Sequence, residues 1–81
     1  MDPKVIIYSK DYCPYCVRAK EFFRKKSIRF DEINISKDPA AYEGLKERTH
    51  HMTVPQIFIN DNFIGGYTDL IAKVNRGEIN L

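Results

Sequence analysis

The segment Cys13-Pro14-Tyr15-Cys16 lies where the hydrophobic pattern of the chain changes, and this junction restricts the possible folds more than any other feature. Before it, Val5-Ile6-Ile7-Tyr8 is an apolar, mostly β-branched run without alternation, which is typical of a strand covered on both faces of a sheet. After it, apolar residues recur at helical spacing, at Cys16, Ala19, Phe22 and Phe23. We therefore expect a buried strand that leads through the cysteine segment into a helix over residues 14–26, with Pro14 at its first position.

The middle of the chain predicts a second strand and a second helix. Residues 28–35 are rich in strand-forming side chains, although they alternate imperfectly between apolar and polar. Ser36-Lys37-Asp38-Pro39 then offers an N-cap followed by a proline, which starts a helix over residues 40–48. The second strand completes a βαβ unit with the first strand and helix.

The last third of the chain predicts a β-hairpin and a final helix. Strands at residues 56–59 and 63–64 are separated by the short polar turn Asn60-Asp61-Asn62, and Gly65-Gly66 ends the second strand. Thr68 is expected to cap the last helix. The pattern also predicts a buried stripe on this helix and a glycine at its C′ position: Leu70, Ile71, Val74 and Gly77.

These elements predict an α/β fold with a mixed four-stranded sheet, arranged as βαβ followed by αββα and flanked by three helices. A chain of 81 residues closes a single hydrophobic core. We therefore expect one domain over residues 1–81, without a repeat or linker. Its content of 43% hydrophobic and 30% charged residues is ordinary for a folded, water-soluble domain.

Charge and hydropathy narrow the range of partners. The 13 basic and 11 acidic residues give a net charge of +2, which is too balanced to indicate a nucleic-acid partner. No apolar stretch approaches the ~20 residues of a membrane helix. The apolar run near the N-terminus is also shorter than the about 7–15 residues of a signal-peptide core. We expect a cytoplasmic protein, a monomer by default, without a membrane or nucleic-acid partner.

Positive charge is concentrated on one flank of the first expected helix. Within this stretch the only acidic residue is Glu21, and the basic residues are Arg18, Lys20, Arg24, Lys25, Lys26 and Arg29. Such a cluster is either a solvated helix face or a patch that steers anions or partner proteins. The sequence leaves both interpretations open.

The two cysteines indicate thiol–disulfide chemistry. Cys13 should lie at the helix N-cap, where unpaired N–H groups and the helix dipole stabilise a thiolate and lower its pKa from ~8.5 into the range of about 3.5–7.5. Cys16 lies in the first turn, less exposed but close enough to attack a mixed disulfide on Cys13. We therefore assign Cys13 as the nucleophile and Cys16 as the resolving thiol.

The alternative role for this cysteine pair is half of a zinc site, completed by His50 and His51. Adjacent histidines do not have the spacing of about three to five residues found between paired histidine ligands, and Pro14 suits a redox turn better than a zinc knuckle. We expect no bound metal and interpret the two histidines as surface residues.

Four motifs together resemble the glutaredoxin family, and the resemblance covers almost the whole chain. They are the Cys13–Cys16 segment, Lys10 before it, Thr53-Val54-Pro55, and Gly65-Gly66-Tyr67-Thr68-Asp69. Their order and spacing are similar to those of short bacterial-type members. The resemblance implies a thioredoxin fold and a glutathione-dependent oxidoreductase that acts on protein disulfides and on glutathionylated proteins.

The resemblance also implies a glutathione site. Pro55 would follow a cis peptide bond, and the main chain of Val54, next to Thr53, would pair with the cysteine of glutathione. At the γ-glutamyl end of glutathione, the N–H of Thr68, close to Gly66, would donate a hydrogen bond to the α-carboxylate. Asp69 would bind the α-ammonium group. Lys10 and Tyr15 would border the glycyl carboxylate and the sulfur.

Two departures from the family pattern concern the edges of this site. His50-His51-Met52 stands where bacterial relatives often carry an arginine and a threonine, so glycyl binding is expected to be weaker or to depend on pH through a histidine. Asp11 places a negative charge near the thiolate and opposes its ionisation.

Two rival functions remain open at this point. One is a glutaredoxin-like electron donor that thioredoxin reductase reduces directly. The other is a binding module that shares a glutathione-ligated [2Fe–2S] cluster between two protomers, although Pro14 stands where such relatives usually have a small residue.

Overall fold

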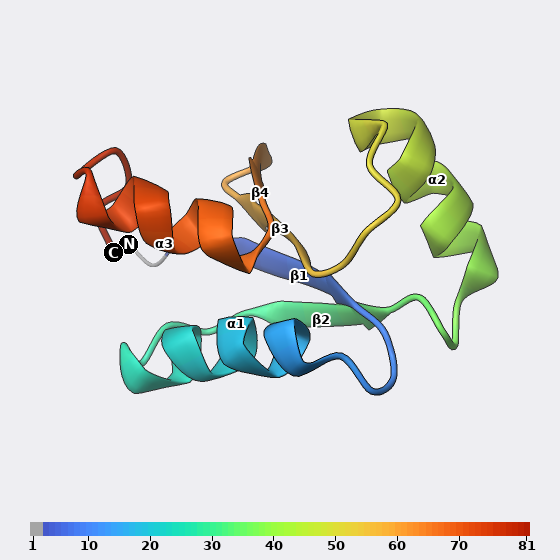
Figure 1. Ribbon diagram of the computed structural model, residues 1–81, viewed down its shortest axis with the longest axis horizontal. Coiled ribbons are helices and arrows are strands. Elements are labelled where there is room, and N and C mark those ends of the chain that lie inside the picture. Colours follow the sequence, from blue (N-terminus) through green and yellow to red (C-terminus); the bar gives the residue numbers. More distant parts are fainter. Residues whose placement is uncertain (1–2) are drawn as a thin grey trace.

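The computed structural model describes residues 3–81, so the first two residues of the domain expected over 1–81 lie outside the described part. Figure 1 shows the elements in chain order. They are β1 Val5–Ser9, α1 Pro14–Lys25, β2 Asp31–Asn34, α2 Pro39–Thr49, β3 Gln56–Ile59, β4 Asn62–Gly65 and α3 Tyr67–Asn75. This is the predicted order of strands and helices.

The strands form one mixed sheet in the order β2-β1-β3-β4. Strand β1 pairs in parallel with β2 and antiparallel with β3, and β3 pairs antiparallel with β4. The two central strands, β1 and β3, contain the unbroken apolar runs Val5-Ile6-Ile7-Tyr8 and Ile57-Phe58-Ile59, as expected of strands covered on both faces. The predicted α/β class, the mixed four-stranded sheet and the thioredoxin fold are confirmed.

Helices α1 and α3 lie on one face of the sheet and α2 on the other, and alternate side chains of the central strands enter the two layers (Figure 1). The larger layer packs the sheet against α1 and α3, and its buried residues are Val5, Ile7, Ala19, Phe23, Ile57, Ile59 and Leu70. The smaller layer joins the sheet to α2 and consists of Tyr8, Leu45 and Phe58.

The second strand is shorter than the predicted 28–35. Ser27 has a φ of 57°, and the Ile28 N–H donates to the Phe23 carbonyl at 2.9 Å, so these residues close α1. Ile28 and Phe30 pack against the larger core layer before the strand begins at Asp31. Helix closure therefore uses the first apolar residues that the sequence pattern assigns to the strand.

Two other boundaries differ from expectation. The hairpin turn consists of Asn60 and Asp61 alone, with φ values of 51° and 67°, and Asn62 pairs with Ile59 as part of β4. Helix α2 begins at Pro39, because Asp38 caps it by accepting the Ala41 N–H at 3.1 Å.

The predicted cap of the last helix is wrong. Gly66 is the N-cap of α3, and Thr68 already lies inside the first turn. The other end of α3 agrees with the prediction, because Gly77 follows the C-cap with a φ of 74°. Of the predicted stripe, Leu70 is fully buried, whereas Ile71 and Val74 are half-buried. None of the helices in residues 3–81 is long and apolar enough to cross a membrane.

Candidate functional site

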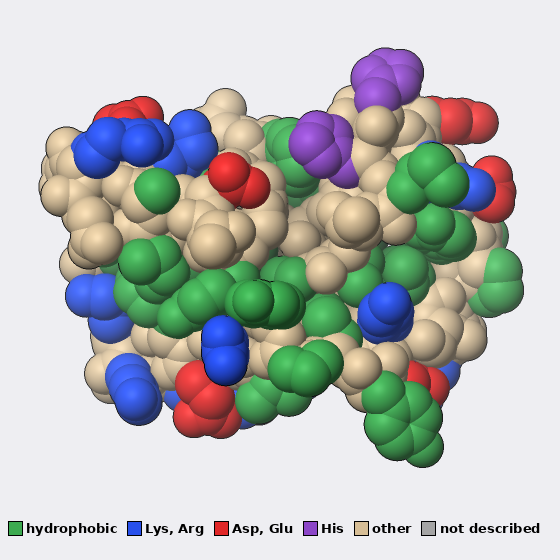
Figure 2. All heavy atoms as spheres, viewed as in Figure 1, with side chains coloured by type: hydrophobic (Ala, Val, Ile, Leu, Met, Phe, Trp, Pro, Cys, Tyr) green, Lys and Arg blue, Asp and Glu red, His purple; other side chains and the backbone are tan. Residues whose placement is uncertain are grey.

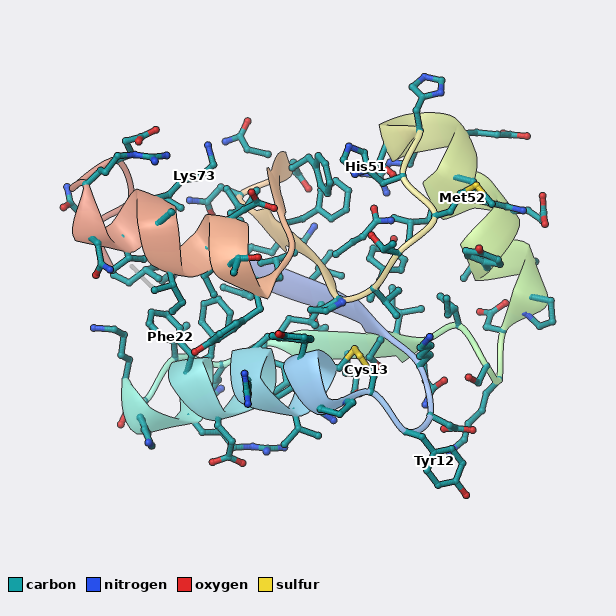
Figure 3. All side chains as sticks on the ribbon, viewed as in Figure 1. Tyr12, Cys13, Phe22, His51, Met52 and Lys73 are labelled. Carbon is teal, nitrogen blue, oxygen red and sulfur yellow. A yellow bond between two sulfur atoms is a disulfide. The ribbon has the colours of Figure 1, made fainter. Side chains whose placement is uncertain are left out.

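Cys13 and Cys16 form a disulfide at the N-terminus of α1 (Figure 3). Cys13 is the N-cap residue, and its Sγ accepts the Cys16 N–H at 3.2 Å, as a capping side chain does. The exposed fraction is 8% for Cys13 and 1% for Cys16. Cys13 is therefore the more exposed of two largely buried cysteines.

The loop before the disulfide is anchored to the end of β2. Asp11 accepts a hydrogen bond from Asn34 Nδ2 at 2.9 Å, and its N–H donates to Ser36 Oγ at 3.1 Å. Asp11, which the sequence places near the Cys13 thiolate, therefore anchors this loop through its carboxylate. Tyr12 follows with a φ of 57° and a fully exposed side chain, which points away from the molecule in Figure 3.

Helix α1 is also tied to the sheet by a polar contact just before this loop. Ser9, the buried last residue of β1, donates to Glu32 Oε2 at 2.6 Å, and Lys20 Nζ of α1 lies 3.0 Å from the same oxygen. The hydrogen bond from Ser9, followed by the charge and hydrogen bond of Lys20, lowers the pKa of Glu32 although partial burial opposes the shift.

The Val54–Pro55 peptide bond is cis, as the family resemblance implies. The Val54 carbonyl oxygen lies 3.8 Å from Cys13 Sγ, so the main chain of this loop faces the disulfide. Gln56, which is 2% exposed, donates through Nε2 to the carbonyls of Thr53 at 2.8 Å and His51 at 3.0 Å. A buried side chain of β3 thereby holds the loop in place.

The side chain of Asp69, in the first turn of α3, folds back onto the Gly65-Gly66 segment. Asp69 Oδ2 accepts the Gly66 N–H at 2.9 Å. A Cβ atom at Gly65, whose φ is 116°, would lie 2.5 Å from that same oxygen. Only glycine fits at position 65, because both the backbone conformation and the approach of Asp69 exclude a side chain.

These segments surround a cavity of about 340 Å³. It is lined by all of the predicted glutathione-binding residues except Lys10: Tyr15, Thr53, Val54, Pro55, Gly66, Thr68 and Asp69. Lys10 is exposed and lies outside the lining. The cavity reaches from Tyr15 and Val54, beside the disulfide, to the N-terminus of α3, whose N–H groups favour an anion.

The cavity wall also contains Gln56 and Phe63, which sequence reasoning missed. Gly65 and Tyr67 of the predicted motif line it too, as does His51, which was expected at the edge of the site. The rings of His51 and Phe63 lie edge to face with centroids 5.2 Å apart. The one available signal was the position of Gln56, a polar residue opening an otherwise apolar strand. Phe63 gave no comparable signal, because its contact with His51 depends on how the α2–β3 loop folds over β4.

The two histidines differ in position. His50 is the exposed C-cap of α2 with a φ of 57°, whereas His51 borders the cavity (Figure 3). Within residues 3–81, no group of three or more histidine, cysteine or acidic side chains is arranged to hold a metal ion.

Comparison with known proteins points to one family. The family model described as Glutaredoxin matches residues 5–64. Glutaredoxin 3 of Escherichia coli strain K12 is 44% identical over 75 residues, which are 93% of this chain and 90% of that protein. A glutaredoxin of Pseudomonas aeruginosa is 38% identical over 77 residues, covering 95% and 92% of the two chains. The crystal structure of a buckwheat glutaredoxin–glutathione complex is similar with a TM-score of 0.84 at 31% identity, and the match covers 91% of this chain and 70% of that chain.

Proposed function

The chain belongs to the glutaredoxin family, and from this premise we propose that a Cys13 thiolate carries its reaction on glutathionylated proteins and protein disulfides. Family membership makes the protein a glutathione-dependent thiol–disulfide oxidoreductase. One observation carries the assignment of roles: the disulfide caps α1 beside the cavity, with Cys13 outermost and Cys16 buried behind it.

In the first route, the Cys13 thiolate attacks the glutathione sulfur of a glutathionylated protein. A disulfide forms between Cys13 and glutathione, and the protein leaves as a thiolate. The thiolate of a second glutathione then attacks the glutathione sulfur held on Cys13, so that oxidised glutathione leaves and the Cys13 thiolate returns. The net reaction converts one mixed disulfide and one glutathione into one protein thiol and one oxidised glutathione.

In the second route, Cys13 opens a protein disulfide and forms a mixed disulfide with one of its sulfurs. Cys16 then attacks Cys13, which releases the reduced protein and leaves the Cys13–Cys16 disulfide of the present structure. Two molecules of glutathione reduce this disulfide in turn and leave as oxidised glutathione. The first turn of α1 favours the internal attack, because it holds the two Cα atoms 5.2 Å apart.

Glutathione is proposed to occupy the 340 Å³ cavity with its sulfur toward Cys13. The Val54 main chain faces that sulfur, and Thr68 and Asp69 lie at the positively polarised start of α3, where a carboxylate and an ammonium group can both be satisfied. The presence of glutathione in the related buckwheat complex supports this placement.

The test of the assigned roles is a pair of cysteine variants. Cys13→Ser should abolish both routes, because neither begins without this thiolate. Cys16→Ser should retain the release of glutathione from a mixed disulfide but lose efficient reduction of an intramolecular protein disulfide. Equal loss of both activities in the two variants would contradict the assignment.

We further propose that the protein acts as a monomer in the cytoplasm. The disulfide and the cavity are built by residues of one chain, so a second subunit is not needed to complete the site. Reduction by glutathione also requires a compartment in which that pool is kept reduced. Light scattering in solution tests the first statement and cell fractionation the second.

A further inference from the structure

A second hollow lies between α1 and α3 and shares Tyr67 with the wall of the glutathione cavity. Its volume is about 240 Å³, and its wall consists of Val17, Arg18, Glu21, Phe22, Lys25 and Tyr67. Tyr67 lines both hollows, and its ring centroid lies 6.2 Å from that of Tyr15 at the edge of the glutathione cavity. We call this second hollow the α1–α3 groove.

The floor of the α1–α3 groove is apolar and open to solvent. Val17 is 51% exposed, Phe22 and Tyr67 are half-buried, and Figure 2 shows a row of hydrophobic side chains across the middle of this face. In Figure 3, Phe22 lies between the two helices, farther along α1 from Cys13. An apolar surface therefore lies along the first helix, between α1 and α3.

The rim of the groove is positively charged. The guanidinium of Arg18 lies 5.1 Å from the centre of the Tyr15 ring, and Lys25 lines the far end. The single acidic residue of the wall, Glu21, is paired with Arg24 at 3.0 Å. In the described part of the chain, no carboxylate lies within 4.0 Å of Arg18 or Lys25. The basic cluster of the sequence thus includes two cations that face an apolar floor.

We propose that the α1–α3 groove binds the polypeptide next to the reacting cysteine of a protein substrate and favours segments that combine apolar side chains with carboxylates. This inference rests on the proposed function, in which glutathione fills the neighbouring cavity. A glutathionylated protein that places its glutathione there must direct its own chain elsewhere, and the groove begins at Tyr67, which also lines that cavity. Carboxylates would meet the free cations of the rim, and apolar side chains would cover the floor.

The test compares two glutathionylated peptides that differ only in the residues beside cysteine, which are leucine and glutamate in one and leucine and lysine in the other. The mixed disulfide of glutathione and 2-mercaptoethanol serves as the substrate without a polypeptide. At low ionic strength, kcat/KM should be about tenfold higher for the acidic peptide than for the basic one. Salt should reduce this ratio, because exposed charges are screened.

Charge-reversal variants test whether the preference for the acidic peptide arises at the α1–α3 groove. Arg18→Glu combined with Lys25→Glu should lower kcat/KM for the acidic peptide about tenfold and leave the 2-mercaptoethanol substrate unchanged within twofold. Lys25→Glu alone should cause about a threefold loss. Its matched control is Lys73→Glu, which makes the same change in net charge on the side of α3 away from α1 (Figure 3) and should have no effect beyond twofold.

Equal kcat/KM for the two peptides with the unchanged protein would overturn the inference, and so would an equal loss in Lys25→Glu and Lys73→Glu. Association of the protein into dimers that disappears in the double variant would also overturn it, because a second copy would then be the occupant of the groove. Absence of turnover with the 2-mercaptoethanol substrate would instead overturn the proposed function, and the groove with it.

Discussion

Asp69 combines a structural contact with the proposed recognition of glutathione. Its Oδ2 accepts the Gly66 N–H at the start of α3, which leaves Oδ1 for a ligand. Replacement of Asp69 by alanine would remove the hydrogen bond to Gly66 and the proposed contact with glutathione together, so their effects could not be separated. The amide of asparagine retains an acceptor for Gly66 but carries no charge, so this substitution isolates the interaction with an ammonium group.

Asp69→Asn should raise KM for a glutathionylated substrate about tenfold, because a charge-assisted hydrogen bond is worth about 1.5–3 kcal/mol. The thermal midpoint should change little, since the cap of α3 is kept. Lys10→Ala should have a smaller effect, because Lys10 is exposed and lies outside the cavity wall, and an exposed ion pair contributes under ~1 kcal/mol. Steady-state kinetics with the two variants measure both values, and an unchanged KM in Asp69→Asn would contradict the placement of the γ-glutamyl end.

Gln56 is proposed to position the loop that faces Cys13. Gln56→Met keeps the length of the side chain but removes the hydrogen bonds to Thr53 and His51, so it should raise KM for glutathione several-fold and lower the free energy of unfolding by about 1–2 kcal/mol. The rate of Cys13 alkylation in the reduced variant should stay the same. A loss of stability with unchanged KM would show that Gln56 acts on the fold alone.

For single residues, the role in the site could be predicted from the sequence where the residue type and its position allow only a few roles. Two cysteines separated by two residues at a strand–helix junction have a small number of roles, and Gly-Gly followed by Thr68 and Asp69 is distinctive enough to carry a ligand hypothesis. Gln56 enters the cavity wall because the loop before it folds back over its side chain. No periodicity or motif describes that conformation, so its position could not be predicted.

The N-terminus of α1 is the element that should activate Cys13. In the reduced protein, the rate of alkylation at Cys13 should follow a midpoint below pH 7, because the Sγ accepts the Cys16 N–H at the positive end of the helix. The measurement uses the Cys16→Ser variant, in which only one thiol reacts. A midpoint near ~8.5, the value of free cysteine, would contradict activation by the helix.

The contact between β1, α1 and β2 predicts a pH dependence of stability. The pKa of Glu32 is lower in the folded protein than in the unfolded chain, where it is near 4.5. Above pH 4.5 the ionised carboxylate therefore contributes its full stabilisation of the folded state. This contribution is lost as the pH falls through the lower pKa of the folded protein. Glu32→Gln should therefore reduce the free energy of unfolding at pH 7 by about 0.5–1.5 kcal/mol.

The difference between the Glu32→Gln variant and the unchanged protein should shrink below pH 4.5. Urea denaturation at several pH values tests this, with Glu47→Gln, at an exposed glutamate of α2, as the matched control. A difference that does not vary with pH would show that the carboxylate charge contributes nothing.

Among the elements, strand and helix types were predictable, and several boundaries were not. The periodicity of α1 and the polar turn of the hairpin are local signals. By contrast, the start of β2 depends on how α1 closes, and the cap of α3 depends on Asp69 reaching Gly66 rather than on the hydroxyl of Thr68. Competition between neighbouring hydrogen-bonding groups decides such boundaries.

For the whole molecule, the arrangement of the sheet explains why distant motifs form one site. Central strands β1 and β3 are antiparallel neighbours, so the loop after β1, with Cys13, and the loop before β3, with Val54, lie at the same edge of the sheet. Strand β4 pairs antiparallel with β3 and therefore returns the Gly-Gly segment to this edge. The order and direction of the strands thus bring the cysteine, Val54-Pro55 and Gly-Gly motifs together. For this reason the spacing of these motifs in the sequence could predict a common site.

Glutathione itself is proposed to supply the electrons for turnover at Cys13. The most direct measurement follows the consumption of NADPH while the protein reduces the mixed disulfide of glutathione and 2-mercaptoethanol. One reaction contains glutathione with glutathione reductase, and the other contains thioredoxin reductase without glutathione. We predict steady turnover in the first reaction, its loss in Cys13→Ser, and no turnover in the second. Turnover with thioredoxin reductase alone, together with none in the presence of glutathione and glutathione reductase, would contradict glutathione as the source of these electrons.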